Sequence, residues 1–113
     1  MSKITSHVLD ASRGKPAADV TVILERNSKE NWVELSRAQT NSDGRAPDLW
    51  KEGMTLEVGV YKLTFETHKY FQSLGLQAFY PQVPIIFEIH DAAQHYHVPL
   101  LLSPFSYSTY RGS

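Results

Sequence analysis

Hydrophobic and polar side chains alternate along most of this chain, and this period of two limits its fold more than any other feature. Val20, Val22 and Leu24, for example, share one face of a short run. Successive side chains of a β-strand point to opposite faces, so this alternation predicts half-buried strands. Comparable runs, rich in β-branched and aromatic residues, occur at 4–10, 32–36, 55–67, 83–89 and 96–102. The pattern therefore predicts a mainly β protein.

Turn-forming residues separate the runs, and one segment has helical spacing. The turn-rich stretches are 12–16, 27–31 and 41–44. Between Thr67, a candidate helix cap, and Gly75, a candidate helix end, the apolar residues fall at helical spacing and predict about two turns of helix. Gly59 is expected to mark a bend or bulge. Seven or eight short strands with one small helix predict a β-sandwich of the Greek-key type.

Length and composition exclude several classes of protein. The 113 residues predict a single domain, 1–113, which buries roughly 65% of its unfolded surface. A net charge of −1 offers no electrostatic reason for nucleic-acid or membrane binding, and the absence of cysteine excludes disulfides and thiolate metal sites. No apolar run approaches the ~20 residues that span a bilayer. The alternation begins at Ile4, which leaves no room for a signal peptide and makes a cytoplasmic protein the expectation.

Two histidines lie on the outer face of the predicted strand 96–102. Tyr96, Val98, Leu100 and Leu102 form its apolar face, so His95 and His97 point the other way, together with Pro99 and Leu101. Three interpretations are open: an ordinary polar face, a zinc site with His7 or His90 as third ligand, or acid–base chemistry, because imidazole titrates near neutral pH. Pro99 removes a ladder donor and favours an edge or bulged position.

His7 and Arg45 are two further candidate site residues. His7 belongs to the strand 4–10, where the pattern does not decide which face is buried, and a lone histidine is more often structural than functional. Arg45 follows the turn signal Asp43–Gly44. It is either a solvated arginine or a clamp for an oxygen-rich anion, which suits a rigid guanidinium. Leu101 and Tyr107 are candidate oligomer contacts.

Four blocks of sequence resemble the transthyretin-related proteins, the 5-hydroxyisourate hydrolases of purine breakdown. They are 6–10 (Ser-His-Val-Leu-Asp), 40–45 (Thr-Asn-Ser-Asp-Gly-Arg), 95–104 (His-Tyr-His-Val-Pro-Leu-Leu-Leu-Ser-Pro) and 107–113 (Tyr-Ser-Thr-Tyr-Arg-Gly-Ser). The blocks occur in the family's order, and the similarity extends from Ile4 to Ser113. Ser106 departs from the glycine that is frequent in the family, and we expect it to adjust a local turn.

The resemblance implies a transthyretin-like, Greek-key β-sandwich of two four-stranded antiparallel sheets with one short helix. It also implies a homotetramer, a dimer of dimers, with active sites in a channel between the dimers. By motif, His7, Arg45 and His97 form the catalytic set, and His95 has at most a supporting role. The substrate-binding residues implied are Ser108, Tyr110, Arg111, Gly112 and Ser113.

The implied reaction opens the six-membered ring of 5-hydroxyisourate, a small-molecule substrate, to 2-oxo-4-hydroxy-4-carboxy-5-ureidoimidazoline. His97 is expected to activate water, His7 to orient it or pass a proton, and Arg45 to stabilise the oxyanion, with no metal or organic cofactor. Two alternatives remain. Transthyretin shares the fold but carries thyroid hormone, and it lacks the histidines and the Tyr-Arg-Gly-Ser ending kept here. A purely structural interaction domain would leave the polar C-terminus unexplained.

Overall fold

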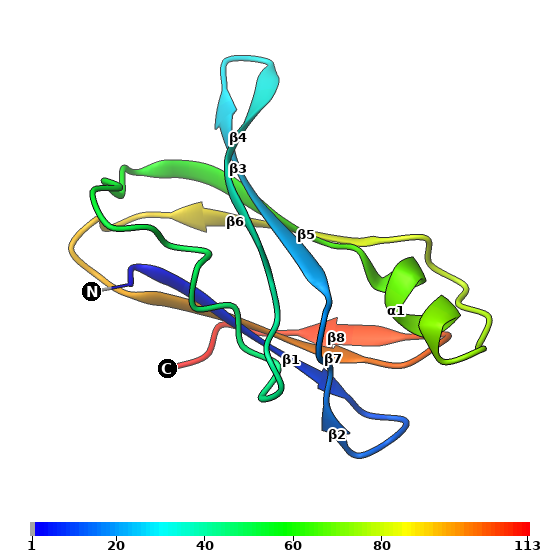
Figure 1. The fold of residues 1–113 in the computed structure, drawn as a ribbon. Coiled ribbons are helices and arrows are strands. Elements are labelled where there is room, and N and C mark those ends of the chain that lie inside the picture. Colours follow the sequence, from blue (N-terminus) through cyan, green and yellow to red (C-terminus); the bar gives the residue numbers. More distant parts are fainter. Residues whose placement is uncertain (1) are drawn as a thin grey trace.

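Two four-stranded sheets lie face to face in the computed structural model, which describes residues 2–113 (Figure 1). One sheet has the order β2-β1-β7-β8, and the other β4-β3-β5-β6. In chain order the elements are β1 (Ile4–Asp10), β2 (Lys15–Pro16), β3 (Thr21–Ser28), β4 (Asn31–Gln39), β5 (Gly59–Phe65), α1 (Thr67–Ser73), β6 (Val83–Ile89), β7 (Tyr96–Leu102) and β8 (Tyr107–Thr109). The expected sandwich with one short helix is confirmed.

The core forms where the apolar faces of the two sheets meet. Leu24 and Leu63 from one sheet and Val8 and Leu100 from the other are fully buried. Along β7 the predicted apolar face, Tyr96 to Leu102, is buried, whereas His97 and Leu101 on the other face are only partly covered. Burying the inner faces leaves the outer face of the β1–β7 sheet available for polar side chains.

One strand pair corrects the expectation of purely antiparallel sheets. β1 and β7 pair in parallel, whereas the other ladders are antiparallel. The two strands are far apart in the chain, so the long intervening segment supplies the crossover that a parallel pair needs. The register places Thr5 beside His97 and His7 beside Pro99. This pairing, which the alternation could not reveal, brings the first and third sequence blocks together.

Two local expectations need correction, and one is confirmed. Thr67 is the first residue of α1 rather than its cap: the N-cap is Glu66, and the buried Thr67 hydroxyl has no hydrogen-bond partner within the described chain. Gly75 does follow the helix with a φ of 72°, as predicted. Gly59 begins β5, while the register irregularity falls in β3, between Leu24 and Glu25. Within residues 2–113, no helix has the length and apolar character needed to cross a membrane.

Pro99 lies in an interior strand, so the sheet edge, one of the two positions expected for it beside a bulge, is wrong. β7 is flanked by β1 and β8. The β7–β8 ladder runs only from Leu102↔Tyr107 to Leu100↔Thr109, and pairing resumes beyond Pro99 at a single bridge between His97 and Gly112. The proline therefore coincides with a break in the ladder, as the loss of its N–H requires. At that break the C-terminal tail leaves β8.

Candidate active site

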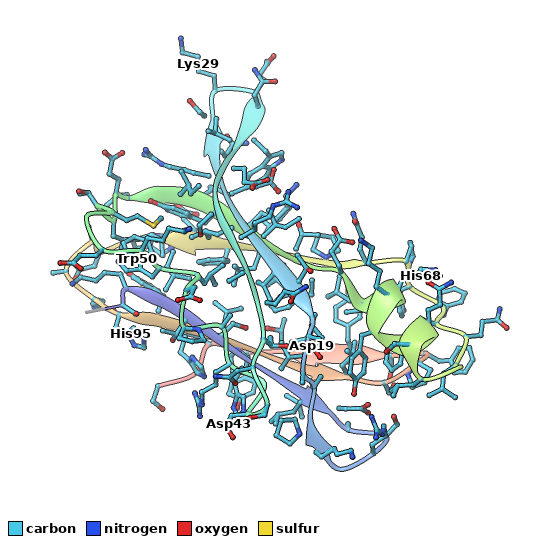
Figure 2. All side chains as sticks on the ribbon, in the orientation of Figure 1. Asp19, Lys29, Asp43, Trp50, His68 and His95 are labelled. Carbon is cyan, nitrogen blue, oxygen red and sulfur yellow. The ribbon has the colours of Figure 1, made fainter. Side chains whose placement is uncertain are left out.

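The three predicted catalytic residues lie in a row across the outer face of the β1–β7 sheet. Arg45 forms an isolated antiparallel bridge with His7, and His97 lies on the neighbouring strand, one pleat from the Pro99 that pairs with His7. Paired residues in a sheet project to the same face. The supposition that folding gathers these three side chains therefore agrees with the structure. Asp43 and His95 appear on the same side of this sheet in Figure 2.

The turn 41–44 positions Arg45. The Asn41 side-chain oxygen accepts hydrogen bonds from the backbone N–H groups of Asp43 (2.9 Å) and Arg45 (3.1 Å). Gly44 has a φ of 78°, and a Cβ at this position would lie 2.3 Å from the Val8 carbonyl oxygen. Only glycine can therefore bring this turn against β1, where the Val8 N–H donates to the Gly44 carbonyl at 2.7 Å. The Arg45 side chain is exposed and has no hydrogen-bond or ion-pair partner among residues 2–113.

The same turn fixes the protonation of one His7 nitrogen. His7 Nε2 lies 2.7 Å from the Asp43 carbonyl oxygen. A carbonyl oxygen can only accept, so Nε2 carries a hydrogen and donates it. When the ring is neutral, Nδ1 is therefore the nitrogen with a free lone pair.

Thr5 connects the two outer histidines of the third block. Its hydroxyl oxygen lies 2.8 Å from His97 Nδ1 and 2.9 Å from His95 Nε2. The two imidazole rings are nearly parallel, with centroids 6.4 Å apart and an interplanar angle of 18°. His97 is partly buried, whereas His95 is exposed.

Burial lowers the pKa of His97 below its usual 6.5, and the neighbouring basic side chains lower it further, Arg45 first and then His95 and His7, which outweighs the smaller opposite effect of the Thr5 backbone. Both effects disfavour the imidazolium. The lowered pKa favours the neutral form of His97, which is the form that a general base requires.

The C-terminal tail contacts the site at Gly112. The Gly112 N–H donates to the His97 carbonyl at 2.8 Å. A Cβ on Gly112 would lie 2.6 Å from His97 Cδ2, so the absence of a side chain lets the tail lie against the ring. Ser108 pairs with Leu101 and so shares the outer face with His97. The expected turn near Ser106 is closed by the Ser103 N–H, which donates to the Ser106 carbonyl at 2.9 Å.

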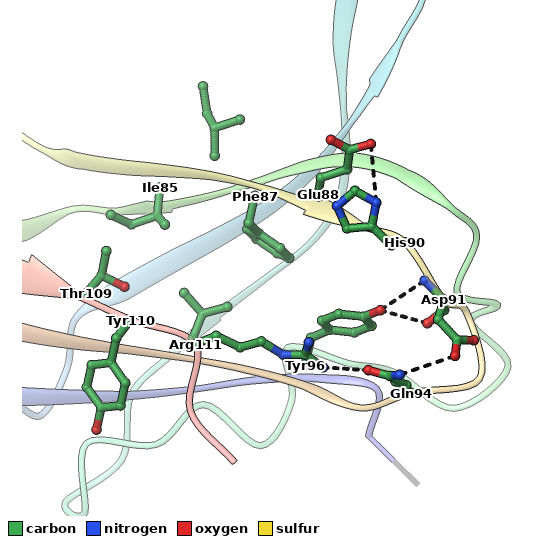
Figure 3. Close-up of a pocket in the computed structure, with 12 residues that line it drawn as sticks. Ile85, Phe87, Glu88, His90, Asp91, Gln94, Tyr96, Thr109, Tyr110 and Arg111 are labelled. Atoms are coloured by element: carbon green, nitrogen blue, oxygen red, sulfur yellow. Dashed lines mark hydrogen bonds and ion pairs between the residues drawn. The ribbon is translucent and has the colours of Figure 1, made fainter.

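Among the described residues, the Arg111 guanidinium does not hydrogen-bond to a histidine ring and reaches only the His95 backbone carbonyl, at 3.4 Å. Its guanidinium lies over the Tyr96 ring, 4.4 Å from the centroid, and donates to the Gln94 side-chain oxygen at 2.8 Å. Tyr96 belongs to the buried face of β7. Arg111 thus lines a mainly apolar cavity of about 480 Å³ near the β6 and β8 edges. The Tyr110 side chain points in a different direction from that of Arg111 (Figure 3).

The zinc interpretation lacks a ligand set. Within the described residues, no three His, Cys, Asp or Glu side chains are grouped so as to hold a metal ion. His95 and His97 share the Thr5 hydroxyl instead, and His90, one of the two suggested third ligands, lies beside Glu88 at 3.8 Å.

Comparison with known proteins decides the family. The model of the HIUase/Transthyretin family matches residues 4–112. This chain belongs to that family. A 5-hydroxyisourate hydrolase of Mus musculus is 45% identical over 114 residues, which cover 99% of this chain and 96% of the mouse protein.

Solved structures of HIUase/Transthyretin proteins share the fold. Klebsiella pneumoniae 5-hydroxyisourate hydrolase aligns with a TM-score of 0.85 and 37% identity, covering 100% of this chain and 94% of that one. Sea bream transthyretin in complex with thyroxine aligns with a TM-score of 0.90 and 29% identity, covering 97% and 94%. (S)-Allantoin synthase, with a TM-score of 0.89, 40% identity and 99% of this chain covered, is longer: this chain spans 44% of it. The fold therefore occurs in proteins that are named for different activities.

Two polar groups at the site were not among the predicted residues. Thr5 shares its face of β1 with His7, a signal that the alternation did contain, but its place beside His97 depends on the parallel register. The Asp43 carbonyl that holds His7 is a backbone group, and no side-chain pattern marks it.

Proposed function

We propose that this chain, as a single catalytic domain over 1–113, hydrolyses 5-hydroxyisourate to 2-oxo-4-hydroxy-4-carboxy-5-ureidoimidazoline in purine catabolism. The observation that carries the proposal is the row of Arg45, His7 and His97 on one face. The pKa of His97 is lowered, and the Arg45 guanidinium has no hydrogen-bond or ion-pair partner among residues 2–113. The mouse and Klebsiella relatives named 5-hydroxyisourate hydrolase support the choice of substrate.

In this proposal His97 is the general base. Its Nδ1 edge faces Thr5 and its Cδ2 edge faces Gly112, so Nε2, at the tip of the ring, is the nitrogen available to a water molecule. Nε2 takes a proton from that water as its oxygen attacks the acyl carbon. A positioned base of this kind contributes about 10²–10⁴-fold to rate.

Arg45 and His7 complete the proposed chemistry. The Arg45 guanidinium stabilises the negative charge that develops on the attacked carbonyl oxygen. His7, whose Nε2 donates to Asp43, presents Nδ1 to orient the water or to receive a proton. The ring opens when the carbon–nitrogen bond breaks, and the leaving nitrogen takes the proton that His97 Nε2 accepted from water, which restores the neutral imidazole. These proposed reaction steps require no metal ion or organic cofactor.

The proposed substrate-binding set is Ser108, Tyr110, Arg111, Gly112 and Ser113. Ser108 and Gly112 border the histidine face directly. Arg111 acts differently: its stacking on Tyr96 and its hydrogen bond to Gln94 anchor the tail, so that the chain end lies beside His97.

We also propose assembly as a homotetramer, a dimer of dimers, with the histidine face at the dimer–dimer interface. β6 and β8 are edge strands, whose unpaired backbone groups can bond to another chain. Exposed apolar side chains lie on the same edges, including Ile86 (60% exposed) and Tyr107 (37%). Assembly would enclose an otherwise open face and turn it into a pocket.

The test follows the decay of freshly generated 5-hydroxyisourate by absorbance. We expect the purified chain to accelerate decay, and Arg45→Ala and His97→Ala each to lose at least a hundredfold in kcat/KM, the usual loss for an oxyanion stabiliser or a base. Native mass spectrometry should find tetramers in all three proteins.

The competing function is hormone carriage, because the sea bream neighbour binds thyroxine. A thyroxine titration run beside the hydrolysis assay separates the two. Tight thyroxine binding without accelerated decay of 5-hydroxyisourate would show that the protein is a hormone carrier and not the proposed hydrolase.

A further inference from the structure

The Thr5 hydroxyl occupies a position that the catalytic set does not explain. It lies within hydrogen-bond distance of two imidazole nitrogens, His97 Nδ1 and His95 Nε2. The sheet register places Thr5 beside His97, because the two residues are partners in the β1–β7 ladder. His95 immediately precedes β7, and its ring lies nearly parallel to that of His97.

A hydroxyl has a single hydrogen, which restricts how it can serve two neutral imidazoles. In one arrangement His97 Nδ1–H donates to the Thr5 oxygen, and the Thr5 hydroxyl donates to His95 Nε2. This leaves a lone pair on His97 Nε2. In the reverse arrangement His95 donates to Thr5, Thr5 donates to His97 Nδ1, and His97 Nε2 carries the hydrogen. Of these two arrangements, only the first makes His97 a base at Nε2. If both imidazoles donated to the two lone pairs of the hydroxyl, His97 Nε2 would also be free, but His95 would not help to fix that tautomer.

We propose that Thr5 and His95 are positioning residues that hold His97 in the tautomer with a hydrogen on Nδ1 and a free lone pair on Nε2. The chain runs from His97 Nδ1–H to the Thr5 oxygen and from the Thr5 hydroxyl to His95 Nε2. These hydrogen bonds have the same role as the third member of a catalytic triad, which fixes the tautomer of the histidine without reacting itself. The inference deepens the proposed hydrolysis and rests on it.

The remaining surroundings of His97 fit this assignment. Gly112 lies against the Cδ2 edge of the His97 ring, and Thr5 lies at its Nδ1 edge, so the ring is held between them. The charged or titratable groups near the ring are Arg45, His7 and His95, and Arg111 reaches the His95 carbonyl from the tail at 3.4 Å. None of these hydrogen-bonds to His97 Nδ1 within the described residues, so His95 can act on that nitrogen only through the Thr5 hydroxyl.

A direct test measures the tautomer without relying on turnover. The ¹⁵N chemical shifts of histidine-labelled protein at neutral pH distinguish protonated from unprotonated ring nitrogens. We expect His97 to show a protonated Nδ1 and an unprotonated Nε2, and Thr5→Val to lose that preference. Valine keeps the branched shape of threonine and removes only the hydroxyl, and far-UV circular dichroism verifies the sheet. A protonated Nε2 in the parent protein, or an unchanged tautomer in Thr5→Val, overturns the proposal.

The kinetic test asks whether the three residues act as a unit. We expect Thr5→Val to lower kcat about tenfold or more with KM within about twofold, and Thr5→Ser, which restores the hydroxyl, to remain within about threefold of the parent. His95→Phe should lower kcat in the same direction. Groups that act together show non-additive losses. The double variant Thr5→Val/His95→Phe should therefore be no slower than Thr5→Val.

The outcomes separate this inference from the proposed function. A parent protein that does not hydrolyse 5-hydroxyisourate removes the proposed function, and the ¹⁵N shifts still decide the tautomer. An active parent with an equally active Thr5→Val, or a double variant whose losses multiply, overturns the role of Thr5 and His95 while the hydrolase assignment stands. Failure of Thr5→Ser to restore kcat has the same meaning, because a shape-only role for Thr5 does not require the hydroxyl.

Discussion

Gly112→Ala should damage the site while leaving the fold intact. The added Cβ would lie 2.6 Å from His97 Cδ2, which is 0.8 Å short of the 3.4 Å at which ordinary van der Waals contact begins. Either the imidazole turns away or the tail lifts and breaks the 2.8 Å hydrogen bond from Gly112 to the His97 carbonyl. A displacement of ~1 Å in a catalytic group costs about a hundredfold in rate, so we expect a loss of that order in kcat/KM.

The assay compares 5-hydroxyisourate decay with urea unfolding for Gly112→Ala and a matched control, Gly75→Ala. Gly75 has a φ of 72° and nothing within 4 Å of the place that an added Cβ would take, so its substitution strains the backbone without touching the site. We expect Gly75→Ala to lose about 1–2 kcal/mol of unfolding free energy and to keep its activity. Gly112→Ala should keep its unfolding free energy and lose activity. If folded Gly112→Ala keeps its kcat/KM within about threefold, the tail does not position His97.

Two further perturbations test the electrostatics. Burial and Arg45 lower the pKa of His97, so this base is protonated only at acid pH. We therefore expect kcat/KM to be constant at neutral pH and to fall about tenfold per pH unit below a midpoint under 6.5. A profile that stays flat in this region refutes the assignment. Asp10 is buried, which raises its pKa, but hydrogen bonds from Ser12, Tyr70 and the Arg13 backbone outweigh burial and lower the pKa below 3.8. Tyr70→Phe removes the 2.6 Å bond to this carboxylate and should cost about 1.5–3 kcal/mol in urea unfolding at pH 7. That penalty should shrink as acid protonates Asp10, because the stabilisation from a lowered carboxyl pKa is lost as pH falls through it. An unchanged unfolding midpoint at pH 7 would contradict this account.

Much of the fold could be predicted from local sequence. Alternation located β1, β3, β6 and β7 and assigned the buried face of β7 correctly, because one buried face makes a period of two visible in the side chains. Gly75 and the turn at 41–44 were also predictable, since a positive φ selects glycine at Gly75 and Gly44. The expectations for Thr67 and Gly59 were wrong because several residues can begin a helix or bend a strand.

The sequence by itself determined the sandwich, the outward direction of His97 and the family, because strand periodicity and long motifs are local properties of the chain. Tertiary structure alone decided that β1 runs parallel to β7, that Arg45 bridges His7, and that Thr5 lies between His95 and His97. Register between distant strands is set by how their buried faces pack, and no nearby residue encodes it. The chemistry proposed here depends on that register, since a slip of one residue would turn either histidine strand toward the core.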